Sequence, residues 1–271
     1  MKKWIWHNEG ELSYITLPEW EKKGVKALFS TRKGGVSKGP FSSLNVGLHV
    51  GDEEVYVLEN RRKILNLLGA KLDNVVCCEQ VHGDRIAVIG KDHKGCGAFS
   101  LKTALPGYDA MITNVSDIFL MAFYADCYSI YFFDPVKYVV GLAHSGWKGT
   151  ALRIACKTVD KMADVFKSNP SDIEVFIGPG IKECCFKISP ELAKQMKQEF
   201  DDFDNIITDK EGSIYWDLTE TNRRLLVEYG IKPENIVICD LCTLCNENKF
   251  FSYRRDNGIT GRMAAVIGLK E

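Results

Sequence analysis

Three short segments of the chain each contain one side chain that metals bind. His82 lies in QVHG, Cys127 in YADC and His144 in LAHSGWKG. One thiol and two imidazoles form a ligand set that suits Zn²⁺, and no fourth side chain is evident. Structural zinc sites usually carry paired ligands a few residues apart, whereas these three stand tens of residues apart. We therefore expect an open, catalytic metal site that the tertiary fold assembles.

Each of these segments is predicted to end a β-strand. In each one the ligand stands where an apolar run stops, beside Gly, Asp or Trp. A lone His or Cys at such a position is more often simply packed or hydrogen-bonded. Open sheets display functional groups at strand ends, however, so the shared context favours one joint site.

Apolar runs rich in β-forming residues predict nine strands, several of them apolar on both faces, which indicates sheet covered on both sides. The predicted strands are residues 26–30, 85–89, 109–113, 118–124, 129–133, 139–143, 173–177, 236–239 and 263–269. Helical periodicity appears over residues 54–68, 149–166, 190–200 and 217–229. Because strand pairs without an intervening helix dominate the middle of the chain, we expect α+β layering rather than a doubly wound nucleotide fold.

Composition indicates a soluble chain with a large core. Hydrophobic residues make up 45% of the 271 residues, and 35 Lys+Arg against 36 Asp+Glu leave a formal charge of -1. A net charge this close to zero gives no overall electrostatic attraction to nucleic acid or to an anionic membrane, so we expect neither as a partner. The longest apolar run, residues 118–125, is too short to span a membrane, and the start is not a signal peptide. We expect a single cytoplasmic domain over residues 1–271, with a homodimer left open.

The ten cysteines are expected to be reduced thiols, since no export signal precedes them. Two vicinal pairs are present, Cys77-Cys78 and Cys184-Cys185. The C-x-x-C-x-x-C run of Cys239, Cys242 and Cys245 could suggest an iron–sulfur or second zinc site, but the fourth Cys and the Pro of the ferredoxin run are missing. We expect Cys239 to face the core and the other two to shape a loop.

A series of longer motifs occurs in one order over nearly the whole chain. They are FSTRKGGVSKGPFSSLNVG, ENRR, EQVHGDRI, YADC, AHSGWKG, IGPGIKECCF and FFSYRRDNGITGRMAA. This series resembles the laccase-domain family, also called YfiH-like or multicopper polyphenol oxidase-like proteins. The resemblance implies a four-layer α-β-β-α sandwich of mixed sheets flanked by helices, with zinc held by His82, Cys127 and His144. Ligand chemistry indicates the same three residues.

The resemblance also implies a purine nucleoside phosphorylase that deaminates adenosine at the same site. The implied substrates are phosphate and adenosine, inosine, guanosine or methylthioadenosine, and the three metal ligands would be the catalytic residues. The older family name implies copper. A three-copper cluster would need many more imidazoles than the five His of this chain supply, so we expect zinc.

Phosphorolysis needs a phosphate site, a hold on the ribose and stabilisation of the departing purine. Arg32, beside the glycines of STRKGG, is our leading phosphate ligand. The alternatives are Arg61, Arg62, Arg254 and Arg255. Gln80 stands two residues before His82, on the same face of an extended segment, and could bind substrate or orient a water.

Acidic residues near the motifs could transfer protons. The candidates are Asp84, Asp109 and Asp126, and Asp109 is also a candidate for substrate binding. Asp126 adjoins Cys127 and would point to the opposite face of a continuing strand, where it could anchor the strand end. Trp147 could stack on a purine, although packing is the commoner role of such an aromatic residue.

Two other functions stay open. Without metal, Cys127 beside His144 could be the nucleophile of a Cys–His hydrolase of an amide or ester, such as a peptidoglycan-precursor editing enzyme. A non-catalytic, zinc-stabilised binding module would instead need a fourth protein ligand that closes the coordination shell.

Overall fold

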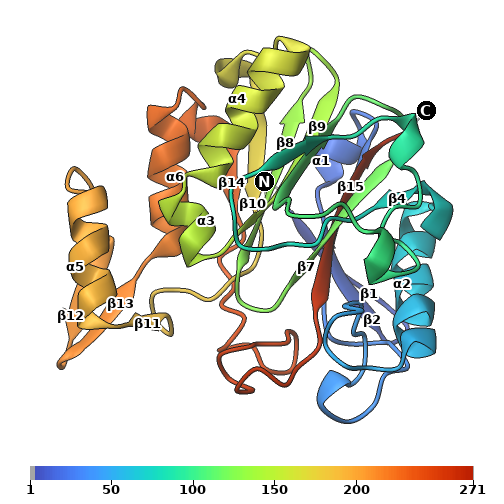
Figure 1. Ribbon diagram of the computed structural model, residues 1–271, viewed down its shortest axis with the longest axis horizontal. Helices are drawn as coiled ribbons and strands as arrows, with labels where there is room; N and C mark the ends of the chain where they lie inside the picture. Colours follow the sequence, from blue (N-terminus) through green and yellow to red (C-terminus); the bar gives the residue numbers. More distant parts are fainter. Residues whose placement is uncertain (1–3, 271) are drawn as a thin grey trace.

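The computed structural model describes residues 4–270 and shows four layers in the order α-β-β-α (Figure 1). The first sheet has the order β1-β2-β3-β15-β7-β4, with bounds Ile5–Glu9, Leu12–Thr16, Val25–Ser30, Met263–Leu269, Phe119–Tyr124 and Val75–Val76. The second has the order β14-β10-β8-β9-β6-β5, with bounds Ile236–Ile238, Glu174–Ile177, Tyr128–Asp134, Val139–Ser145, Ala110–Thr113 and Ile86–Val88. Parallel and antiparallel pairs occur in both, as the predicted α+β sandwich of mixed sheets requires.

The inner faces of the two sheets form the central core. Phe29, Leu120 and Ile267 of the first sheet pack with Tyr131 and Phe133 of the second. Strands β7, β8, β9 and β15 are buried along their whole length, because helices cover the outer faces as well. The two-sided apolar runs in the sequence are thereby explained.

Helices cover each sheet from outside (Figure 1). Helix α2 (Glu54–Leu68) buries Ile64 and Leu65 against the first sheet and ends at Gly69, whose φ of 68° suits glycine. The second sheet is covered by α3 (Trp147–Ala151), α4 (Ile154–Phe166) and α6 (Leu218–Glu228). Short α1 (Pro18–Glu21) precedes β3.

A small antiparallel sheet with the order β11-β13-β12 stands at one side of the sandwich together with α5 (Figure 1). Its strands are Lys187–Ile188, Ser213–Trp216 and Ile207–Lys210, and α5 spans Pro190–Glu199. Helix α5 begins as predicted, because Ser189 accepts the N–H of Leu192 and Pro190 occupies the first turn.

All nine predicted strands are confirmed to within two residues. The prediction of one continuous helix over residues 149–166 is wrong. The helical segment starts earlier, at Trp147, and breaks into α3 and α4 at Arg153, whose φ is 58°. A residue in the left-handed conformation cannot continue a right-handed helix. The periodicity of apolar side chains does not reveal such a break in the backbone. The hairpin β1–β2 and the small sheet were not predicted.

The ends of the predicted domain, residues 1–3 and 271, lie outside the described residues. Between residues 4 and 270, none of the helices combines the length and the apolar character that crossing a membrane requires. The cytoplasmic location and the homodimer stay predictions.

Candidate metal centre and substrate cavity

The three predicted metal ligands meet where the chain crosses between the two sheets. His82 lies in the connection from β4 of the first sheet to β5 of the second. Cys127 occupies the turn from β7 to β8, a second crossing, and His144 is the penultimate residue of β9. Their ligand atoms all lie within 4.8 Å of one another, with 4.0 Å between Cys127 Sγ and His82 Nε2.

The prediction that His82 ends a strand is wrong. Both Gln80 and His82 have positive φ, 56° and 61°, so this segment is a tight loop rather than an extended chain. The carboxylate of Asp109 stabilises the loop by accepting the N–H groups of Val81, His82 and Gly83 at 3.1, 2.9 and 2.7 Å. Successive N–H groups that converge on one anion make such left-handed conformations favourable.

Asp109 also holds the second imidazole. Its Oδ1 accepts the Nδ1–H of His144 at 2.9 Å, which leaves Nε2 of His144 as the nitrogen that would coordinate a metal ion on losing its proton. Burial alone would raise the pKa of Asp109, but the hydrogen bonds from His144, Gly83 and His82 outweigh it and keep the pKa below its usual value. One buried carboxylate thus positions two of the three ligands.

The environment of Cys127 favours its thiolate. Burial would raise the pKa of this thiol, but His144 and His82 outweigh it and lower the pKa to about 6. Burial would likewise lower the pKa of His144, but Cys127 and Asp109 raise it to about 9. Gly146 leaves room for the sulfur, because a Cβ there would lie 2.7 Å from Cys127 Sγ.

This donor set fits a single Zn²⁺ ion. A thiolate and two imidazoles with one nitrogen each available are common zinc ligands, and zinc with three protein ligands keeps an open position. Within residues 4–270 the group that contains these ligands has three members, not the four that a closed binding module would need. His7 and His93 are bound elsewhere, by Thr16 and Gly90, so the described histidines do not form a multicopper cluster.

The three ligands line a cavity of about 480 Å³, a size that suits a small organic ligand. Aromatic and aliphatic side chains form much of its wall, namely Phe123, Trp147, Ile181, Phe186, Leu218 and Tyr253. Polar groups at the cavity include His49, Glu79, Gln80, Arg254 and Arg262. The predicted stacking residue, Trp147, is therefore beside the candidate metal centre.

Two arginines predicted to bind substrate do not line this cavity. Arg32 lies in a separate hollow with Arg255, where its guanidinium donates to the carbonyls of Ser42 and Glu247 and stacks on Phe251. Arg62 is exposed on α2. Arg61 is buried and donates to the carbonyls of Val46, Gly97 and Ala98.

Other predicted residues have structural partners. The side chain of Gln80 lines the cavity but exchanges two hydrogen bonds with the backbone of Phe123 at 2.8 and 2.9 Å. Asp126 accepts hydrogen bonds from Thr243, Ser252 and the N–H of Arg254, which agrees with an anchoring role. Asp84 forms an ion pair with Lys157.

Sequence reasoning missed three residues at the cavity. Arg262, in the motif TGRMAA, interacts electrostatically with Cys127 and Asp126, and burial lowers its pKa. Burial and the charge of Arg262 lower the pKa of His49 to about 4, which makes it a neutral imidazole. Glu79 adds a carboxylate that accepts the N–H of Gly107. The only signal for Arg262 was its place in a motif.

An α-β-β-α sandwich with a His, Cys and His ligand set at the crossing between its sheets defines a laccase-domain protein. The family model described as multi-copper polyphenol oxidoreductase laccase matches residues 26–270, and the chain belongs to this family. The crystal structure of YlmD from Geobacillus stearothermophilus is similar, with a TM-score of 0.93 and 39% identity over 98% of this chain and 99% of that one.

Curated relatives of the chain carry enzyme names. "Purine nucleoside phosphorylase YlmD" of Geobacillus stearothermophilus is 42% identical over 251 residues, which cover 92% of this chain and 91% of the relative. "Adenosine deaminase RL5" of an unknown prokaryotic organism is 32% identical over 243 residues, 89% of this chain and 92% of the relative. The chain is therefore an enzyme of this family.

Proposed function

We propose that this protein is a zinc-dependent purine nucleoside phosphorylase with adenosine deaminase activity at the same site. The proposed substrates are phosphate and adenosine, inosine, guanosine or methylthioadenosine. The observation that carries the proposal is the position of His82, Cys127 and His144 in a cavity that has both an aromatic wall and arginines. The names of the two curated relatives support both reactions.

The cavity wall suits a purine nucleoside. Phe123, Phe186 and Trp147 offer flat apolar surface to a purine ring, and the volume of about 480 Å³ accommodates base and ribose together. Burial of the ring excludes water from the glycosidic bond, which matters because phosphate rather than water must react there.

Phosphate would bind on the arginine side of the cavity. Arg262 is held by hydrogen bonds from Nη1 to the carbonyls of Thr260 and Gly261 at 2.8 and 3.1 Å. Arg254 is held in the same way by the carbonyl of Lys187 at 2.9 Å. A guanidinium fixed beforehand loses little entropy when it binds an oxyanion. Both arginines line the cavity, so we assign them to phosphate in place of Arg32.

His82, Cys127 and His144 would hold the zinc ion, and Asp109 would keep both imidazoles in their binding orientation. A zinc ion bound there would supply Lewis acidity and positive charge in the cavity. Glu79 lines the same cavity, and its carboxylate can accept or donate a proton at the purine.

The test is incubation of the purified protein with adenosine, with and without phosphate, followed by chromatography. Adenine release that depends on phosphate supports phosphorolysis, and inosine formed without phosphate supports deamination. Both should disappear in His82→Ala and His144→Ala variants that keep the circular dichroism of the folded protein. Turnover that persists in these variants, or no turnover by zinc-loaded protein, would refute the proposal.

A second candidate is the Cys–His hydrolase, which the contact between Asp109 and His144 favours. Together with Cys127 these residues form a Cys–His–Asp arrangement, and the lowered pKa of Cys127 provides a thiolate nucleophile. Zinc and an acyl group compete for the same sulfur. Removal of zinc should therefore abolish nucleoside turnover yet increase hydrolysis of a thiol-reactive ester, whereas a zinc enzyme without this activity leaves the ester intact.

A further inference from the structure

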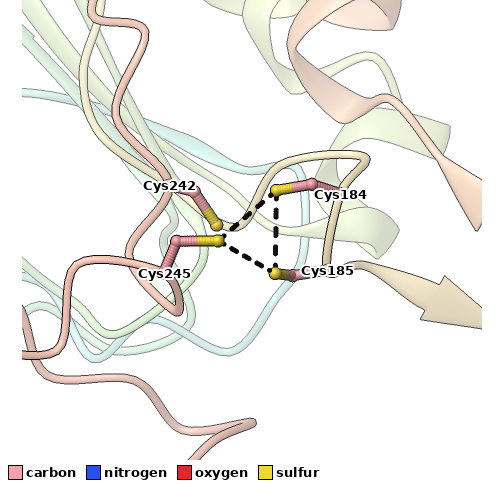
Figure 2. Close-up of side chains that lie close together, drawn as sticks. All are labelled: Cys184, Cys185, Cys242 and Cys245. Carbon is pink, nitrogen blue, oxygen red and sulfur yellow. Dashed lines mark hydrogen bonds between the residues drawn. The ribbon is translucent and has the colours of Figure 1, made fainter.

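Four cysteine sulfurs converge at a second place, outside the cavity (Figure 2). Cys184, Cys185, Cys242 and Cys245 each direct Sγ toward the others, and all four sulfurs lie within 4.8 Å of one another. Three of the separations are 3.6 Å for Cys184 to Cys185, 3.6 Å for Cys184 to Cys245 and 3.3 Å for Cys185 to Cys245. The predicted loop role of Cys242 and Cys245 is thus incomplete.

The fold itself brings these cysteines together. Strands β10 and β14 are parallel neighbours, so the loops that follow them leave the sheet at the same edge. The first loop carries the vicinal pair and the second carries Cys242 and Cys245. A bridge between Gly180 and Cys242, with a 3.0 Å hydrogen bond from Thr243 N to Gly180 O, joins the loops. Cys239 remains in the central core, as predicted.

The sulfur separations fit one tetrahedral metal ion. With Zn–S bonds of about 2.3 Å, the sulfurs of a tetrahedral site stand about 3.8 Å apart. A disulfide needs about 2 Å between its sulfurs, far less than any of the three distances. A polynuclear iron–sulfur cluster needs thiolates on different irons, which sets them further apart than these.

The backbone around Cys242 also suits a bound thiolate. The backbone N–H groups of Lys182, Leu244 and Cys245 are near enough to the Cys242 sulfur to favour its thiolate form. Asn246 closes the C-x-x-C turn, because its N–H and its side-chain amide both donate to the carbonyl of Cys242, at 3.2 and 2.9 Å. N–H groups aimed at a coordinating sulfur neutralise part of its charge.

We propose that Cys184, Cys185, Cys242 and Cys245 bind a second zinc ion in a structural tetrathiolate site. Its four protein ligands leave no open position, in contrast to the His82, Cys127 and His144 centre. The site fastens the loop that carries Ile181 and Phe186 to the segment that leads to Tyr253 and Arg254, and all four of these residues line the cavity.

Metal content per chain tests this assignment. After reconstitution with Zn²⁺ and removal of unbound metal, wild-type protein should hold two zinc ions, and Cys127→Ala and Cys242→Ser should hold one each. Cys239→Ala is the matched control, because it belongs to the same C-x-x-C-x-x-C run but lies outside the sulfur cluster, and it should keep both ions. One zinc ion in wild-type protein that Cys127→Ala removes would overturn the proposal, as would two ions retained by Cys242→Ser.

X-ray absorption on the Cys127→Ala variant provides a test that leaves the second site untouched. The remaining zinc should have only sulfur neighbours, at about 2.3 Å. Nitrogen or oxygen neighbours, or iron in place of zinc, would overturn the assignment. So would a disulfide between two of these four cysteines, found by peptide mapping of protein purified without reductant.

Discussion

At the scale of single residues, Asp109 organises the candidate centre. Its carboxylate is buried and accepts four hydrogen bonds, three from consecutive backbone N–H groups and one from His144. Those contacts fix both the loop that carries His82 and the orientation of the second imidazole. Asp109 therefore acts on the metal through other residues, and we regard it as a positioning residue rather than the substrate ligand we expected.

Asp109→Asn should weaken zinc binding about 10- to 100-fold, as is typical for a partner of metal-bound histidine. Asparagine offers one acceptor oxygen, and its amide would face N–H donors. The measurement is a zinc titration against a chromophoric chelator. Asp84→Asn is the control, because Asp84 only pairs with Lys157, and equal affinities in the two variants would contradict the role of Asp109.

Arg262→Gln should raise the KM for phosphate about 10- to 100-fold, the value of one or two charge-assisted hydrogen bonds. The KM for the nucleoside should change much less. Arg32→Gln serves as the matched variant, since its guanidinium contacts loop carbonyls away from the cavity. Initial rates over a phosphate series decide between them, and a larger effect from Arg32 would restore the hypothesis drawn from the sequence.

The metal-free protein should show an unusually acidic thiol at Cys127. A thiol reacts with iodoacetamide as thiolate, so alkylation should persist as the pH falls and decline only near the pKa of about 6. Site-resolved mass spectrometry distinguishes this peptide from those of exposed Cys184 and Cys245. Loss of reactivity already near pH 8 would mean that His82 and His144 do not stabilise the thiolate.

The grouping of His82, Cys127 and His144 was predictable from the sequence because imidazole and thiol ligands are distinctive wherever they stand. The substrate residues were not. Arg32 has the glycine-rich surroundings of an anion site, yet the folded loops place it in a hollow apart from the cavity that the candidate metal ligands line. His49 and Arg262 gain their place at the cavity from tertiary packing, which local sequence does not reveal.

At the scale of elements, two helix ends differ in how well their residue suits the backbone. Gly69 after α2 and Lys167 after α4 both adopt left-handed φ, 68° and 60°. The N–H of Lys167 caps α4, so the conformation is required, but a Cβ makes it strained. The sequence predicts the first helix end, because glycine is a common residue at this position. It gives no such signal for the second end, where the residue is lysine.

Lys167→Gly should therefore stabilise the protein by about 1 kcal/mol, and Gly69→Ala should destabilise it by a similar amount. Urea denaturation followed by circular dichroism measures both changes in the free energy of unfolding. The two variants control for each other, because one removes a Cβ and the other adds a Cβ at a left-handed helix cap. Changes of equal sign would contradict the argument from backbone strain.

Strands were predicted better than their surroundings. Continuous apolar runs predict β7, β8, β9 and β15, because strands that are buried on both faces need apolar residues at every position. The loop that carries His82 could not be predicted from the local sequence, since its shape depends on a hydrogen bond to Asp109, 27 residues away. The β1–β2 hairpin escaped prediction because β1, at the sheet edge, has no buried residue and β2 buries a run of only three.

At the scale of the whole molecule, the last strand is central to the fold. Strand β15 lies between β3 and β7 in the first sheet and is fully buried, whereas β1 lies at the edge of that sheet. Each end of the chain thus contributes very differently to the core.

Removal of residues 263–271 should abolish folding, because it opens the middle of one sheet and exposes the central core. Removal of residues 1–9, which include edge strand β1, should lower the melting temperature while leaving a cooperative transition. Soluble yield and thermal unfolding by circular dichroism give the comparison. A folded protein without β15 would show that the sheet order does not determine stability.

The separation of the candidate metal ligands along the chain would govern how an ion is acquired. His82 and Cys127 stand 45 residues apart and belong to two different crossings between the sheets, so the site exists only after both sheets have paired. The polypeptide must then fold first and collect its ion from the surroundings afterwards. Divalent copper outcompetes zinc for nitrogen and sulfur ligands. The ion found in a purified preparation would consequently depend on the metals available during growth and purification. Reconstitution of the metal-free protein with single metals identifies the ion that supports activity.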